Sequence, residues 1–136
     1  DPESVWRLLS PRVRHMRQEV FWVLLLNTKN HLIGQPQALT VGLLDVSPVH
    51  PREVLSLVLR HNAAALIVAH NHPSGDPTPS SDDLRITRQL AASARIMNIR
   101  LLDHVILGRQ REQQSGYLSL REQGLVDFDS DGGKGI

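Results

Sequence analysis

Cysteine is absent from the 136 residues of this chain, and its absence removes several kinds of chemistry at once. Disulfide bonds, thiolate nucleophiles and cysteine-ligated zinc are all excluded. A metal ion in this protein must therefore be bound by imidazole, carboxylate or water. A chain of this length is long enough to bury the core of one domain without a disulfide or a metal to hold it folded.

The chain also lacks a large excess of charge. Lysine and arginine total 15 against 14 aspartates and glutamates, which gives a formal net charge of +1. A dedicated nucleic-acid-binding domain usually carries a clear basic excess. Arginines at positions 7, 12, 14 and 17 could form a phosphate-contacting face, but a solvated helix surface is the favoured interpretation of this cluster.

Long hydrophobic runs are missing as well. The longest, such as residues 20–26, fall far short of the ~20 apolar residues that a membrane-spanning helix needs. No segment resembles a secretory signal peptide, so we expect a cytoplasmic protein with no membrane partner. Because the chain begins with Asp1 rather than methionine, we also expect that further sequence precedes it.

Helical and extended patterns alternate along the chain. Apolar residues at helical spacing predict helices at residues 1–10, 12–18 and 81–97 and another that begins at Pro51. Apolar and β-branched runs predict strands at residues 19–26, 31–40, 63–69 and 100–107. Prolines, a glycine and small polar residues predict an irregular loop over residues 71–82, and a hairpin with a short helix is expected after Gly108.

This alternation predicts an α/β fold in which helices cover a β-sheet. We divide the chain into an N-terminal helical segment at residues 1–18, a main domain at residues 19–126 and a flexible tail at residues 127–136. Functional sites in such folds favour the loops at strand ends. The segment from His70 to Asp83 lies at a boundary of this kind.

Two histidines and an aspartate in this segment form a candidate metal site. His70 and His72 are two residues apart where an extended strand ends, so their imidazoles project to the same side. Asp83 follows in the first turn of the next helix, and a loop of this length lets its carboxylate complete a set of three ligands. The fourth tetrahedral position then remains for water, as catalysis by zinc requires.

Two further residues suit hydrolytic chemistry at such a site. Glu19 begins a strand that could lie beside the strand ending at His70, where its carboxylate would accept and relay a proton from the attacking water. Ser80 lies three residues before Asp83 and could donate a hydrogen bond to an oxyanion.

Each feature also has a structural interpretation. Ser80 and Asp83 fit a helix N-terminus in which serine caps the backbone, and for this pair alone capping is the favoured interpretation. A single His-x-His pair is a weak signal, and a glutamate beside a strand is more often a solvated charge than a base. Only the combined spacing favours a functional site.

That spacing resembles the JAMM signature of the MPN-plus metalloproteases: an upstream Glu19, then His70-x-His72, seven residues, Ser80, two residues and Asp83. Three further blocks resemble the bacterial RadC-like proteins, namely AHNHPSGDPTPSSDD at residues 69–83, VHPRE at 49–53 and LDH at 102–104. With the segment at residues 19–30, the resemblance covers residues 19–125.

The resemblance implies a mixed β-sheet flanked by helices in a three-layer JAB/MPN architecture, related to the cytidine deaminase fold. It implies one zinc ion held by His70, His72 and Asp83, with Glu19 as general acid and base and Ser80 stabilising the transition state. Members of the wider superfamily cleave peptide or isopeptide bonds, so a protein or peptide substrate is expected. Base deamination is not expected, because the deaminase zinc motif requires cysteines.

Three functions stay open at this point. The first is a zinc hydrolase acting on amide bonds, and the second is a DNA-repair-associated nucleic-acid-binding module with a structural metal. RadC-like proteins have a historical association with DNA repair, and DNA contact would involve an N-terminal region outside these residues. The third is a catalytically silent scaffold or dimerisation unit, against which the retained site residues argue.

Asp103 and His104 are polar residues inside an apolar strand, and such groups need partners when they are buried. They could orient the metal ligands from behind. A buried structural hydrogen bond is the favoured interpretation of both.

Overall fold

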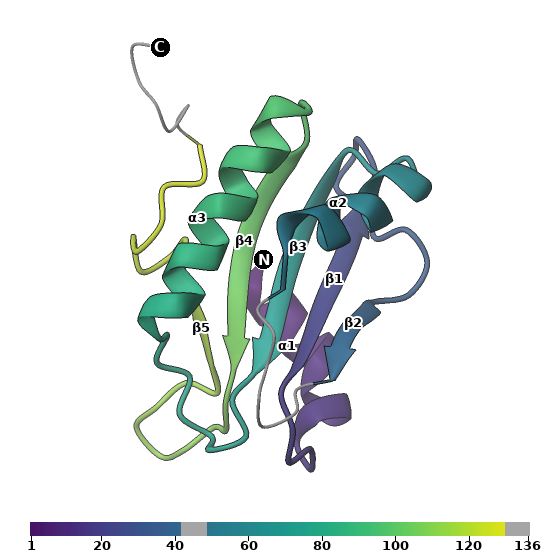
Figure 1. The fold of residues 1–136 in the computed structure, drawn as a ribbon. Helices are drawn as coiled ribbons and strands as arrows, with labels where there is room; N and C mark the ends of the chain where they lie inside the picture. Colours follow the sequence, from purple (N-terminus) through teal and green to yellow (C-terminus); the bar gives the residue numbers. More distant parts are fainter. Residues whose placement is uncertain (42–48, 130–136) are drawn as a thin grey trace.

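The computed structural model describes residues 1–41 and 49–129 of the chain. The described residues form three helices and five strands (Figure 1). The helices are α1 (Pro2–Val13), α2 (Pro51–Arg60) and α3 (Ser81–Ile96). The strands are β1 (Val20–Leu26), β2 (Gln37–Val41), β3 (Ala65–Asn71), β4 (Arg100–Leu107) and β5 (Tyr117–Ser119).

The five strands form one mixed sheet in the order β2-β1-β3-β4-β5. The central pair, β3 and β4, is parallel, and α3 forms the crossover between these two strands. The other neighbouring pairs are antiparallel. All seven residues of β1 are buried, as a strand covered on both faces requires.

Helices cover both faces of this sheet. The larger core cluster packs α2 and α3 against one face, with Val54 and Val58 from α2 and Leu90 and Ala94 from α3. The second cluster packs α1 against the opposite face. Figure 1 shows α2 and α3 in front of the sheet and α1 behind it. The predicted α/β fold with a mixed sheet flanked by helices in three layers is therefore confirmed.

One N-terminal helix replaces the two that the sequence predicts. Helix α1 contains Pro11 and continues to Val13, because the Arg14 amide donates to the Ser10 carbonyl at 3.0 Å and keeps the last turn intact. The apolar spacing of Val5, Leu9 and Val13 also carries through the proline onto the sheet. The predicted end at Ser10 and the predicted helix at residues 12–18 are thus both wrong.

The strand predicted at residues 31–40 is shorter than expected. Strand β2 begins only at Gln37, and Leu32 contributes an isolated bridge to Leu26. Gly34 adopts a positive φ of 66° in the intervening turn. The hairpin expected after Gly108 is present as the β4-β5 pair, whereas residues 120–124 form turns in place of the expected helix.

Most of the predicted tail, residues 130–136, and the segment at residues 42–48, between the predicted strand at 31–40 and the helix that begins at Pro51, lie outside the described residues. Within the described start of the tail, Phe128 is buried against the core. Among the described helices, none is both long and apolar enough to cross a membrane.

Candidate metal centre

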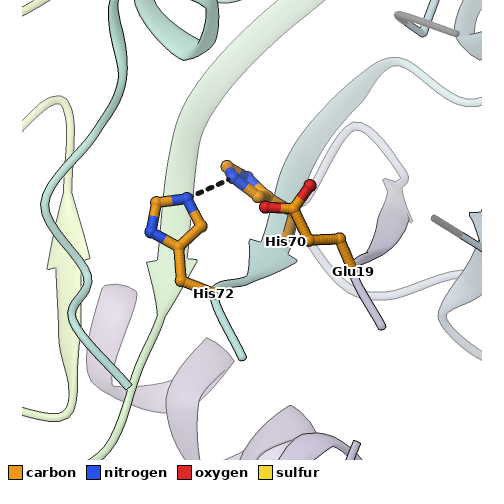
Figure 2. A group of neighbouring side chains, drawn as sticks. All are labelled: Glu19, His70 and His72. Atoms are coloured by element: carbon orange, nitrogen blue, oxygen red, sulfur yellow. Dashed lines mark hydrogen bonds between the residues drawn. The ribbon is translucent and has the colours of Figure 1, made fainter. Parts of the chain in front are cut away.

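The candidate metal centre lies where β3 ends. In the antiparallel β1-β3 pair, Phe21 is in register with His70, so the start of β1 lies beside the end of β3. The Nε2 atoms of His70 and His72 are 2.9 Å apart. Figure 2 shows the two imidazoles turned toward each other with the Glu19 carboxylate beside His70. The predicted projection of both histidines to one side is observed.

Asp83 reaches the same point from the first turn of α3. Its Oδ1 lies 3.3 Å from Nε2 of His70, and its Oδ2 lies 3.3 Å from Nε2 of His72. Burial tends to raise the pKa of Asp83, but its contacts with the two imidazoles outweigh it and hold this pKa well below its usual value. The carboxylate is therefore ionised and directed at both imidazoles.

Ser80 and Asp83 also form the helix cap that the sequence suggests. The Ser80 hydroxyl accepts a hydrogen bond from the Asp83 amide at 3.0 Å, and Asp83 Oδ2 accepts one from the Ser80 amide at 2.9 Å. Capping and site formation are thus not alternatives, because the cap fixes the Asp83 carboxylate where it meets the histidines. Accepting a bond also leaves the Ser80 hydroxyl hydrogen available to donate.

Glu19 completes the group from the start of β1. Glu19, His70 and His72 each place a potential ligand atom within 4.8 Å of the others. The backbone on both sides of Glu19 is held by Asn71, whose side chain accepts from the Val20 amide at 2.7 Å and donates to the Gln18 carbonyl at 3.0 Å. Asn71 is 2% exposed, and its bond with the Val20 amide is buried.

The hydrogen-bond partner of Nδ1 in His72, the ring nitrogen that faces away from His70, shows that this nitrogen carries a hydrogen. Nδ1 of His72 lies 2.9 Å from the carbonyl oxygen of Asp76. A carbonyl only accepts, so Nδ1 carries a hydrogen and donates it. Burial lowers the pKa of His72, but the hydrogen bonds with Asp83 and with the Asp76 carbonyl, together with the charges of Asp83 and Glu19, raise it overall. His72 therefore holds a second proton more tightly than a free imidazole does.

The outer nitrogen of His70 faces another imidazole. Its Nδ1 lies 2.8 Å from Nε2 of His104, whose own Nδ1 lies 2.6 Å from the Thr87 hydroxyl. Burial, together with the neighbouring His70, lowers the pKa of His104 well below its ordinary value. His104 is consequently neutral near pH 7.

Asp103 has a structural environment, as predicted. Its carboxylate accepts from the Ser119 hydroxyl at 2.5 Å, the Arg121 amide at 3.1 Å and the His104 amide at 2.7 Å. Burial raises the pKa of Asp103 despite these bonds. The two neighbours thus differ: Asp103 ties β4 to the segment after β5, and His104 contacts a candidate ligand.

The donor set is compatible with a metal ion. Ligand atoms about 2.0–2.1 Å from a tetrahedral zinc ion would lie about 3.3–3.4 Å from one another. The Asp83 oxygens lie at 3.3 Å from the two Nε2 atoms, while the two Nε2 atoms, 2.9 Å apart, would have to move slightly apart. Two imidazoles and a carboxylate are also the ligand types found at catalytic zinc sites that keep one position open.

Sequence comparison places this chain in a family. The chain matches the RadC-like JAB domain over residues 1–125. The chain belongs to the RadC-like JAB domain family. Its N-terminal helix α1 lies within the matched range, in keeping with its packing on the sheet.

Named relatives in this family come from several bacteria. A UPF0758 protein of Symbiobacterium thermophilum is 47% identical over 93% of this chain and 51% of its own length. One from Listeria monocytogenes is 49% identical over 90% of this chain and 52% of its own length. One from Caldanaerobacter subterraneus is 42% identical over 94% of this chain and 52% of its own length. The chain thus spans about half the length of the curated relatives it matches.

The structure brings Glu19, His70, His72, Ser80 and Asp83 together as the sequence predicts, while their chemical roles stay predictions. Sequence reasoning missed Asn71 and Thr87. Asn71 lies between the two histidines, where its position was visible but its partners, 51 and 53 residues away, were not. Thr87 lies on the buried face of α3, and its partner His104 is 17 residues away in the sequence.

Proposed function

We propose that this domain is a zinc-dependent hydrolase of the JAMM type that cleaves peptide or isopeptide-like amide bonds. The observation that supports it most strongly is the convergence of both Asp83 oxygens on the Nε2 atoms of His70 and His72, with the Glu19 carboxylate within reach. The family membership supports the same function, since the wider superfamily that it resembles contains metalloproteases.

His70, His72 and Asp83 are the proposed ligands. Glu19 could in principle replace Asp83, because it also lies near both imidazoles. We assign the ligand role to Asp83 because each of its oxygens already faces one Nε2 atom and its carboxylate is fixed by the helix cap. Glu19 then remains free for proton transfer.

Zinc in this position would lower the pKa of a bound water toward about 7 and polarise the substrate carbonyl. Glu19 takes a proton from the attacking water onto its carboxylate and delivers it to the leaving amide nitrogen. Ser80 donates its hydroxyl hydrogen to the negative charge that develops on the carbonyl oxygen. Asn71 keeps Glu19 in place by holding the backbone on either side of it.

Cleavage of peptide mixtures tests this function directly. Zinc-loaded protein is incubated with peptides from a digested cell extract, supplemented with lysine-branched peptides, and new termini are identified by mass spectrometry. We expect cleavage by the unaltered protein and a rate at least ~100-fold lower for Glu19→Gln, which removes the base but retains the ligands.

Glu53→Gln provides the matched control, because Glu53 caps α2 and belongs to the first turn of that helix rather than to the site. It should cleave like the unaltered protein. Equal cleavage by zinc-loaded Glu19→Gln, or no cleavage by any zinc-loaded form, would overturn the proposal.

A DNA-repair-associated module with a structural metal is the alternative function. It predicts DNA binding whose affinity falls steeply with salt, because phosphate contacts release counterions. Filter binding at several salt concentrations separates it from the hydrolase. Tight, salt-sensitive binding together with unchanged peptides would favour this alternative.

A further inference from the structure

A buried hydrogen-bonded chain links two of the proposed ligands from behind. It runs from Nδ1 of His70 to Nε2 of His104 at 2.8 Å, and from Nδ1 of His104 to the Thr87 hydroxyl at 2.6 Å. The Thr87 hydroxyl then donates to the main-chain carbonyl of Asp83 at 2.6 Å. This row of hydrogen bonds thus starts at a proposed ligand on β3, passes through His104 on β4 and ends at the backbone of a proposed ligand on α3.

The bond from Thr87 to the Asp83 carbonyl sets the direction of the other two hydrogen bonds. A carbonyl only accepts and a hydroxyl has one hydrogen, so the Thr87 oxygen must accept from Nδ1–H of His104. His104 is 1% exposed and its ring nitrogens contact His70 and the Thr87 hydroxyl rather than a carboxylate, which favours a neutral imidazole with a single N–H. Nε2 of His104 must then accept from Nδ1–H of His70. Nε2 of His70 is then left with its lone pair, and this is the atom that faces His72 and Asp83.

Water cannot easily substitute for these bonds. A reversed order of donors would leave the Thr87 hydroxyl oxygen and the Asp83 carbonyl oxygen 2.6 Å apart with no hydrogen between them. Thr87 is 0% exposed and His104 is 1% exposed, so bulk water does not reach these atoms. Reversal would take the Thr87 hydrogen away from the Asp83 carbonyl and place a hydrogen on Nε2 of His70. His72 reaches the same tautomer more directly, through a single bond to the Asp76 carbonyl.

We infer that Thr87 and His104 are positioning residues that hold His70 in the tautomer whose Nε2 lone pair is directed at the metal. This inference rests on the proposed metal centre. Outer partners of ligating histidines generally fix the tautomer and ring orientation, and their loss typically weakens metal binding 10–100-fold. Here the outer partner is a second neutral histidine whose orientation is in turn fixed by Thr87.

Two measurements on the same protein test it. The tautomer of His70 is read in the metal-free protein from long-range proton–nitrogen NMR correlations, and the zinc dissociation constant is measured by competition with a chromophoric chelator. In the unaltered protein we expect the hydrogen on Nδ1 of His70. A hydrogen on Nε2 would overturn the inference without any variant being needed.

Thr87→Val removes the hydroxyl and retains the side-chain shape. We expect zinc binding about 10–100-fold weaker and a mixture of His70 tautomers, because His104 no longer has a defined direction. Thr87→Ser retains the hydroxyl and should stay within about threefold of the unaltered protein. Equal behaviour of the two variants, or unchanged affinity and tautomer in Thr87→Val, would contradict the inference.

Ser119→Ala is the matched control. The Ser119 hydroxyl is also buried and bonded, but its partner is Asp103. It should lower stability while leaving the zinc affinity and the His70 tautomer unchanged. The outcomes also separate the two proposals: an unaltered protein that binds no zinc refutes the metal centre, while the tautomer of metal-free His70 still tests the positioning role.

Discussion

Replacing Asn71 with alanine should destabilise the protein more than its small loss of volume suggests. The side chain accepts from the Val20 amide and donates to the Gln18 carbonyl. Val20 is 5% exposed, so its amide would lose its partner inside the protein at a cost of about 1–3 kcal/mol. Gln18 is exposed and its carbonyl can bind water, which limits that loss to about 1 kcal/mol. We expect a total of about 2–4 kcal/mol.

Chemical denaturation of the metal-free proteins measures this cost. Asn27→Ala is the matched control, because the Asn27 side chain also accepts two backbone bonds, from Lys29 and His31, in an exposed turn. Water replaces those bonds, so about 0.5–1.5 kcal/mol is expected. A loss in Asn71→Ala no greater than in Asn27→Ala would refute the role assigned to Asn71.

The same variant should separate catalysis from metal binding. The Asn71 side chain holds the backbone around Glu19. It takes no part in the contacts between Asp83 and the histidines. We expect turnover per bound zinc to fall up to about 100-fold, since a base displaced by about 1 Å loses that much. Zinc affinity should change only a few-fold, and a loss confined to affinity would contradict this division of roles.

Three further predictions concern the loop, the cap and the protons of the site. Gly108→Ala should cost about 1–3 kcal/mol and weaken zinc binding, because its methyl group would overlap the Gly75 carbonyl in the loop after His72. Gly34 has open space around it but a positive φ, so Gly34→Ala measures the cost of backbone strain alone. An equal loss of stability in Gly34→Ala and Gly108→Ala would contradict the overlap proposed for Gly108. Ser80→Asn should retain most of the capping stability but lower turnover about 100-fold or more, and unchanged turnover would remove Ser80 from the mechanism. Zinc affinity should fall as the pH falls from 8 to 5.5, because the raised pKa of His72 makes protons compete with the metal. The fall should reach up to about tenfold per pH unit for each proton displaced. Measuring the zinc dissociation constant at several pH values checks this, and an affinity that does not change with pH contradicts it.

The fold and the convergence of the candidate site residues were predictable because their signals are local. His70 and His72 are two residues apart on one strand, and Ser80 and Asp83 share one helical turn, so short-range geometry placed each pair. Their mutual approach followed from the alternation of strands and helices. Pro11 is the local signal that failed, since packing of Val13 on the sheet outweighed the proline.

The supporting residues were not predictable, because their partners are remote in sequence. Asn71 binds the backbone 51 and 53 residues earlier, and His104 contacts His70 across 34 residues. Polar residues in the β4 segment indicated that partners must exist, but register alone decides that His104 faces His70 while Asp103 faces Ser119. Sequence spacing carries no information about that choice.

Zinc titration of the metal-free protein tests the central claim most directly. We expect one zinc ion per chain, bound at least about 100-fold more weakly after His72→Ala or Asp83→Asn. His31 lies in an exposed turn, so zinc binding should be unchanged after His31→Ala. Absence of stoichiometric binding, or equal losses in all three variants, would contradict it.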